Sequence, residues 1–182
     1  MNNDLTWVRW WVSPWENAHR DWRAQKGFVQ TEALSRAHHQ QVSRLFGIEP
    51  ELPPPPSAPV LQLVLSCNQQ QDLALLLVKE ICNPSNDSRV NEELRRWCQR
   101  LAKALAPAPI LVNVDDPLHC LRAWVSPATW QRLRLSFDRH RVLDVEAYPR
   151  LLNAHDRLDT LWQAALWRAT STTVNETPDL PS

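Results

Sequence analysis

Glycine is almost absent from this chain. Only two of its 182 residues are glycines, Gly27 and Gly47. Tight hairpins and glycine-rich phosphate loops need positive φ angles or very close backbone approach, and glycine is the residue that permits both. Two glycines therefore leave little room for tight hairpins and exclude most familiar nucleotide-binding motifs. A mainly α-helical fold is the class that this sequence favours.

Helix start signals and apolar spacing support the helical class. The segments Ser13-Pro14-Trp15-Glu16 and Ser126-Pro127 each place a capping serine before a proline, and proline suits the first position of a helix. Apolar side chains recur at alternating four- and three-residue steps over residues 88–105, and a similar stripe runs over residues 149–168. Both spacings predict amphipathic helices.

The length of 182 residues fits one domain, which would bury most of the surface that the unfolded chain exposes. We expect a single compact domain of about six to eight helices over residues 1–169. Residues 170–182 are rich in Thr, Ser, Pro and Asn and are expected to form a disordered tail.

Residues 50–59 contain six prolines in ten positions. This composition prevents a helix and favours an extended polyproline II spacer inside the domain; a ligand for an aromatic groove is the alternative interpretation. The next six residues, V-L-Q-L-V-L at 60–65, fit either a short buried strand or the beginning of a helix. Periodicity over six residues does not separate the two.

The chain has 20 basic and 20 acidic side chains, so its formal charge is zero. Without a basic field we expect no nucleic-acid partner. No run of about 18 apolar residues and no secretory signal pattern is present, which predicts a cytoplasmic protein without membrane insertion. The four cysteines form no C-x-x-C pair, so we expect buried free thiols, no metal and no cofactor. They are Cys67, Cys82, Cys98 and Cys120.

A group of ionisable residues at 115–120 suggests catalysis. Asp115, Asp116, His119 and Cys120 could serve as acid, base or nucleophile of a small hydrolase-like helical enzyme. However, an aspartate before a proline also has the form of a helix N-cap, and an acidic pair there complements the helix dipole. Because no further ligand or nucleophile appears at a supporting spacing, we prefer capping and expect no enzymatic activity.

Tryptophans and arginines form the candidate contact surface. Five of the ten tryptophans lie within residues 7–22, and an indole suits either a core edge or an interface because it combines apolar area with one N–H donor. Residues 121–141 contain five arginines and one aspartate, a net charge of +4, and form either a dock for an acidic surface or a solvated basic edge. The candidate docking residues are Trp7, Trp10, Trp11, Trp15, Arg132, Arg134, Arg139 and Arg141.

Two segments resemble the SctK family of type III secretion systems, in particular its HrpD-type members from plant-associated bacteria. They are W-W-V-S-P-W-E-N-A-H at residues 10–19 and L-R-A-W-V-S-P-A-T-W-Q-R-L-R-L-S-F-D-R-H-R-V at residues 121–142. The resemblance implies a mainly helical, non-enzymatic, cytoplasmic accessory protein of the sorting platform. Such a protein bridges the inner-membrane ring protein, of the SctD class, and the pod protein, of the SctQ class. A type III secretion chaperone is the alternative, but its expected acidic balance is missing.

Overall fold

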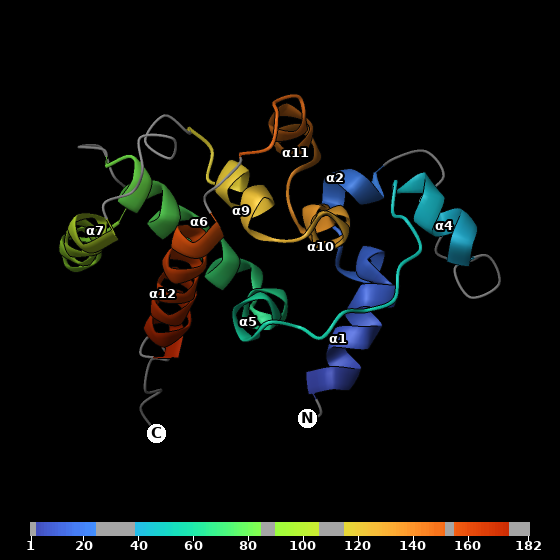
Figure 1. The fold of residues 1–182 in the computed structure, drawn as a ribbon, viewed down its shortest axis with the longest axis horizontal. Helices are drawn as coiled ribbons and strands as arrows, with labels where there is room; N and C mark the ends of the chain where they lie inside the picture. The colour runs from blue at the N-terminus through green and yellow to red at the C-terminus, as the bar shows by residue number, and fades with distance from the viewer. Residues whose placement is uncertain (1–2, 25–38, 85–89, 106–114, 152–154, 175–182) are drawn as a thin grey trace, which may run out of the picture. The chain divides into compact units, whose positions relative to one another are not determined.

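The computed structural model describes residues 3–24, 39–84, 90–105, 115–151 and 155–174. These residues form ten α-helices and two short 3-10 helices, and no β-strand occurs among them (Figure 1). The predicted mainly helical fold is confirmed. The expected number of helices was too low, because the segments after Ser13 and Ser126 are each divided into several short helices.

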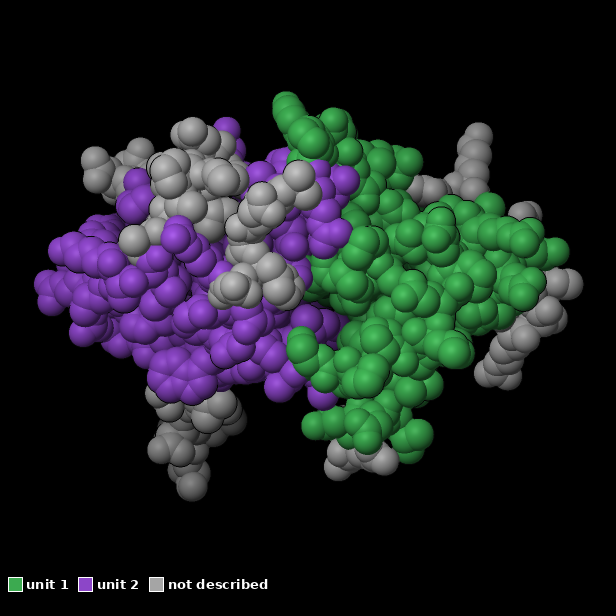
Figure 2. Space-filling model, in the orientation of Figure 1, with its two compact units in different colours: residues 1–57, 125–149 green, residues 58–124, 150–182 purple. Residues whose placement is uncertain are grey.

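The chain separates into two compact units, each assembled from two stretches of sequence (Figure 2). Unit 1 comprises Met1–Ser57 and Val125–Pro149, and unit 2 comprises Ala58–Trp124 and Arg150–Ser182. Compact units of one chain can belong to one folded domain, so the expected single domain over residues 1–169 stays a prediction.

Unit 1 contains short helices joined by irregular segments. They are α1 Asn3–Val12, η1 Pro14–Asn17, α2 Arg20–Arg23, α4 His39–Leu45, α10 Pro127–Leu133, η2 Arg134–Ser136 and α11 Arg139–Glu146. The Ser126 hydroxyl accepts a hydrogen bond from the Thr129 N–H at 3.1 Å, so the start signal there forms the expected cap. Ser13 makes no such bond, and Glu16 instead pairs with Arg9, so the first start signal begins only a 3-10 turn.

Unit 2 contains the three longest of the described helices and two shorter ones. They are α5 Ala58–Leu65, α6 Asn68–Cys82, α7 Glu92–Leu105, α9 Leu118–Trp124 and α12 His155–Val174. Helix α12 packs against α5, α6 and α9, and α6 also packs against α7. The core is mainly aliphatic, with Leu77, Leu121, Leu158 and Leu166 completely buried. None of the described helices is both long enough and apolar enough to span a membrane.

Two predicted boundaries at the edges of unit 2 need correction. Residues 60–65 are helical and not a strand, because Pro59 fits the first turn of α5 and the helix buries Leu63 completely. The spacer without regular structure therefore ends at residue 57.

The predicted tail also begins too early, since α12 continues to Val174. The Thr170 and Ser171 hydroxyls donate to helix carbonyls one turn back, so these polar residues are accommodated in the helix. Residues 175–182 lie outside the described part of the chain.

Candidate functional site

The four candidate tryptophans are interior residues of unit 1. Trp7, Trp10, Trp11 and Trp15 have between 2% and 6% of their surface exposed. Helix α1 places the first three on one face, where the Trp7 and Trp10 rings stack with centroids 5.0 Å apart. Of the two interpretations, core edge and interface, the burial supports the first, and these indoles do not form a docking surface in unit 1.

Two of these indoles hold the proline-rich segment. The Trp7 Nε1–H donates to the Pro54 carbonyl and the Trp11 Nε1–H to the Glu51 carbonyl, both at 2.8 Å. Proline has no N–H and takes part in no regular ladder, so the carbonyls of this segment need donors from elsewhere. The tryptophans thus fix the spacer against α1, a role that the sequence analysis did not identify.

Arg132 is also an interior residue, with 3% of its surface exposed. Its guanidinium lies 3.9 Å from the centroid of the Trp11 ring and donates to the backbone carbonyls of Trp11, Ala128 and Glu49. Burial lowers the pKa of Arg132 to about 10, and the nearby Glu51 acts in the opposite direction. Arg132 therefore stays cationic at neutral pH, but it ties three backbone segments together instead of facing a partner.

Arg134 also makes mainly internal contacts. Its Nη1 lies 2.9 Å from both carboxylate oxygens of Glu146, and its Nη2 donates to the Phe46 carbonyl at 2.6 Å. Gly47 has a φ of 59°, and a side chain there would meet Arg134 Nη2 at 3.0 Å, so glycine is needed at this position. Of the predicted arginines, only the exposed Arg139 and the half-buried Arg141 stay candidates for partner contact.

Exposed apolar groups also occur on α11 and just after it. Leu143 follows Arg139 by one helical turn and is exposed, and Tyr148, just after the helix, has 63% of its surface exposed. We call Arg139, Leu143 and Tyr148 the α11 surface. Leu143 and Tyr148 were not predicted as contact residues, although Leu143 is out of phase with the buried Val142 and Val145.

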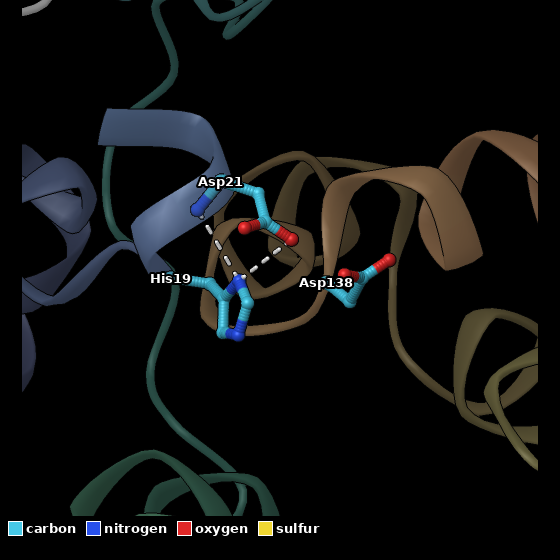
Figure 3. A group of neighbouring side chains, drawn as sticks. All are labelled: His19, Asp21 and Asp138. Atoms are coloured by element: carbon cyan, nitrogen blue, oxygen red, sulfur yellow. Dashed lines mark hydrogen bonds and ion pairs between the residues drawn. The ribbon is translucent and has the colours of Figure 1, made fainter. Parts of the chain in front are cut away.

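His19, Asp21 and Asp138 form a compact polar group in unit 1 (Figure 3). One ligand atom from each lies within 4.8 Å of the others, a spacing that could hold a cation. Two of these residues already cap helices: His19 Nδ1 accepts from the Asp21 N–H at 3.4 Å, and Asp138 accepts from the Arg141 N–H at 2.9 Å. Capping at the starts of α2 and α11 therefore gives His19 and Asp138 a structural role.

The two carboxyls of this group act on each other, and their pKa values move apart. The bond to Asp138 raises the pKa of Asp21, while the Arg141 N–H and then Asp21 lower the pKa of Asp138. Asp21 therefore keeps its proton to a higher pH than Asp138 does.

The residues of the enzyme alternative have separate roles in unit 2. The Asp116 carboxylate accepts from the Leu118 N–H at 2.8 Å, which is the predicted cap of α9. Asp115 is exposed, whereas Cys120 is buried and hydrogen-bonded to Cys82, an arrangement that raises the pKa of the Cys120 thiol. Burial lowers the pKa of His119. A buried, neutral thiol is a poor nucleophile, so this geometry offers little support for catalysis.

The cysteines are free thiols, as expected. Cys82, Cys98 and Cys120 are buried, and burial raises the pKa of Cys98 to about 12. Cys67 was expected to be buried but is exposed, because it lies just before α6, where its backbone N–H donates to the Gln70 side chain.

A pocket of about 430 Å³ opens beside Trp11 in unit 1. The end of α1, helix α4, residues 48–53 and Arg132 line it. We call it the Trp11 pocket. It brings together two of the predicted contact residues, Trp11 and Arg132, although neither was expected to line a concave site.

Comparisons of this chain with protein-family models, with curated proteins and with solved structures find no match.

Proposed function

We propose that this protein is a non-enzymatic adaptor of a bacterial type III secretion system, of the SctK type. In this role it lies in the cytoplasm beside the inner-membrane secretion apparatus. It links the cytoplasmic part of the SctD-class ring protein to the SctQ-class pod protein. It uses no cofactor, and its activity consists of binding both partners at once.

The supporting observation is that the two segments on which the family resemblance rests pack against each other. Arg132 of the second segment donates to the Trp11 carbonyl of the first at 2.9 Å. The His19 N–H of the first segment donates to the Leu135 carbonyl of the second at 2.7 Å. More than a hundred residues separate these partners in sequence, so the parts of the two segments that lie in unit 1 belong to one packed body.

The α11 surface is the part of this body that best fits partner binding. Tyrosine and arginine are enriched among the residues that contribute most to protein interfaces, and leucine adds apolar area. Arginine also selects acidic partners and orients them. The buried tryptophans belong to the interior of unit 1 and do not contact the partner themselves.

Co-purification tests the proposal. The chain is mixed with the ring protein's cytoplasmic domain and with the pod protein encoded in the same genome, and each should be retained. The double variant Arg139→Glu/Tyr148→Ala should lose at least one partner by about thirtyfold, the size expected for an interface hot spot. Its far-UV circular dichroism should not change, because both side chains are exposed.

The matched control is Arg20→Glu, which reverses the charge of another highly exposed arginine of unit 1. It should retain both partners. If the wild-type chain binds neither partner, the adaptor proposal fails. If the wild-type chain and the double variant bind equally well, the α11 surface is not the contact.

A further inference from the structure

The Trp11 pocket contains a buried cation whose hydrogen bonds all go to neutral groups. Arg132 lines the pocket, and its three hydrogen bonds end on backbone carbonyls. Among the described residues it forms no ion pair with a carboxylate. Buried charges are ordinarily compensated by an opposite charge, since backbone dipoles replace only part of the hydration that is lost. A further anion that bound directly to this guanidinium would therefore compensate its charge.

The guanidinium retains the donors that an anion needs. Arginine has five N–H groups, and the hydrogen bonds above use one each on Nε, Nη1 and Nη2. One N–H on each of the two terminal nitrogens is left within the described structure. Two N–H groups of a guanidinium can donate to the two oxygens of a carboxylate.

The remaining lining favours an apolar neighbour for that carboxylate. Val12, Ile48, Leu52 and Pro53 line the pocket together with the Trp11 ring. Leu52 has 87% of its surface exposed, so its side chain gains contact area when an apolar group enters. The volume of about 430 Å³ falls in the range of ligand pockets and accepts a few side chains, not a folded domain.

We propose that the Trp11 pocket binds a short segment of a partner protein in which an acidic residue is flanked by leucine-like residues. The carboxylate binds the two remaining N–H groups of Arg132, and an apolar side chain packs against Val12 and Leu52. The inference uses the pocket alone and does not depend on the secretion role or on the α11 surface.

Two acidic residues also line the pocket, and their charges lower its affinity for an acidic segment. Glu49 and Glu51 are exposed, so water screens their carboxylates more than it screens the buried guanidinium. Glu51 nevertheless acts on Arg132, because its charge raises the pKa of that side chain against the effect of burial. An incoming carboxylate competes with Glu51 for the same cation.

A pair of tripeptides tests the charge requirement. The probe is acetyl-Leu-Glu-Leu-amide, and the matched control is acetyl-Leu-Gln-Leu-amide, which differs only in charge. Binding is followed by NMR on the indole N–H resonance of Trp11, with the indole of Trp124 in unit 2 as an internal control. The glutamate peptide should shift the Trp11 resonance with an affinity about tenfold higher than the glutamine peptide, as expected for hydrogen bonds to a charged group.

Variants at the rim test the location without removing Arg132, whose loss would disturb the fold. Leu52→Ser should lower the affinity for the glutamate peptide by about fivefold. Leu45→Ser changes another highly exposed leucine that does not line the pocket and should leave the affinity unchanged. Glu51→Gln should strengthen binding by about twofold, because it removes the competing charge.

The proposal is overturned if both peptides bind equally, if neither shifts the Trp11 resonance at millimolar concentration, or if the Trp124 resonance responds as strongly. It is also overturned if Leu45→Ser weakens binding as much as Leu52→Ser. These results would leave the co-purification test of the adaptor role unaffected, since that test depends on a different surface.

Discussion

The interiors of the two units are built from different side chains. In unit 2, leucines and alanines of α6, α9 and α12 fill the space between long helices, as Leu77, Leu121 and Ala165 illustrate. In unit 1, large aromatic rings fill the space between short helices, and their polar ends reach backbone carbonyls of irregular segments. The first interior depends mainly on apolar area, whereas the second depends also on directional hydrogen bonds.

This difference explains how the side chains of each unit stabilise its fold. Apolar contact between helices is non-directional and roughly proportional to the area removed from water. A hydrogen bond to a buried carbonyl is modest in net value, but the carbonyl is costly to leave without a donor. Unit 1 therefore keeps its proline-rich segment in place through a few specific donors, and each donor can be removed individually.

The largest loss of stability should follow from truncating the centre of unit 2. Trp162 is completely buried and stacks on Trp124 with ring centroids 5.5 Å apart. Trp162→Ala should lower the free energy of unfolding by about 3–5 kcal/mol, through lost apolar burial and the cavity left behind. Urea unfolding followed by circular dichroism measures this change.

Trp167→Ala on the same helix is the control for that variant. Trp167 has 60% of its surface exposed, so its loss should change the free energy of unfolding by less than about 0.5 kcal/mol. Similar effects at the two positions would contradict the packing of α12 described above.

The next largest effect should come from the cation that ties unit 1 together. Arg132→Met keeps most of the side-chain volume but leaves the carbonyls of Trp11, Ala128 and Glu49 without this donor. We expect a loss of about 3 kcal/mol in urea unfolding, because the bonds come from a charged donor in a buried place. Arg139→Met, on an exposed arginine, should be nearly neutral. A stable Arg132→Met variant would show that the hydrogen bonds of this guanidinium do not stabilise unit 1.

The contrast between the two units also shows how much of the fold can be predicted from the sequence. The stripe of Leu94, Leu101 and their neighbours predicts α7 because a helix repeats every 3.6 residues, and local signals also predict the Asp116 and Ser126 caps. The six residues at 60–65 were too few to separate helix from strand. Their helical state follows from Pro59 and from the burial of Leu63.

The site in unit 1 was less predictable, for a physical reason. Tryptophan and arginine side chains have polar ends that suit either an interface or an internal carbonyl, and composition does not separate the two. The partners of Trp11 and Arg132 lie 40 and up to 121 positions away. A local spacing rule contains no information on such pairs, so the surface expected from these residues proved to be an interior, and the exposed Leu143 and Tyr148 were overlooked.

A smaller difference in the free energy of unfolding should distinguish a tryptophan whose indole N–H has a hydrogen-bond acceptor from one whose indole N–H has none. Trp11→Phe and Trp162→Phe both remove one ring and one N–H, but only Trp11 donates to a carbonyl, that of Glu51, while Trp162 Nε1 is buried with no acceptor among the described residues. Trp11→Phe should therefore cost about 1 kcal/mol more than Trp162→Phe in urea unfolding. An equal cost would mean that the donor contributes nothing to unit 1.

The smallest effect should be a pH dependence confined to unit 1. The pKa of Asp21 is raised, chiefly by its bond to Asp138, so its contribution to stability is present at low pH and is lost as pH rises through the raised value. The pKa of Asp138 is lowered, chiefly by the Arg141 N–H, so its contribution is lost only as pH falls through the lowered value. Together the two carboxyls stabilise unit 1 most near the ordinary aspartate pKa.

Asp21→Asn removes the part of this pH dependence that comes from Asp21, because an amide N–H donates to Asp138 without titrating. The urea midpoints of the wild-type chain and of Asp21→Asn, measured from about pH 3 to pH 7, should therefore separate as pH rises, with the variant losing less stability. Asp72→Asn changes an exposed carboxylate of unit 2 and should follow the wild-type curve. If Asp21→Asn also follows that curve, the interaction between the Asp21 and Asp138 carboxyls does not stabilise unit 1.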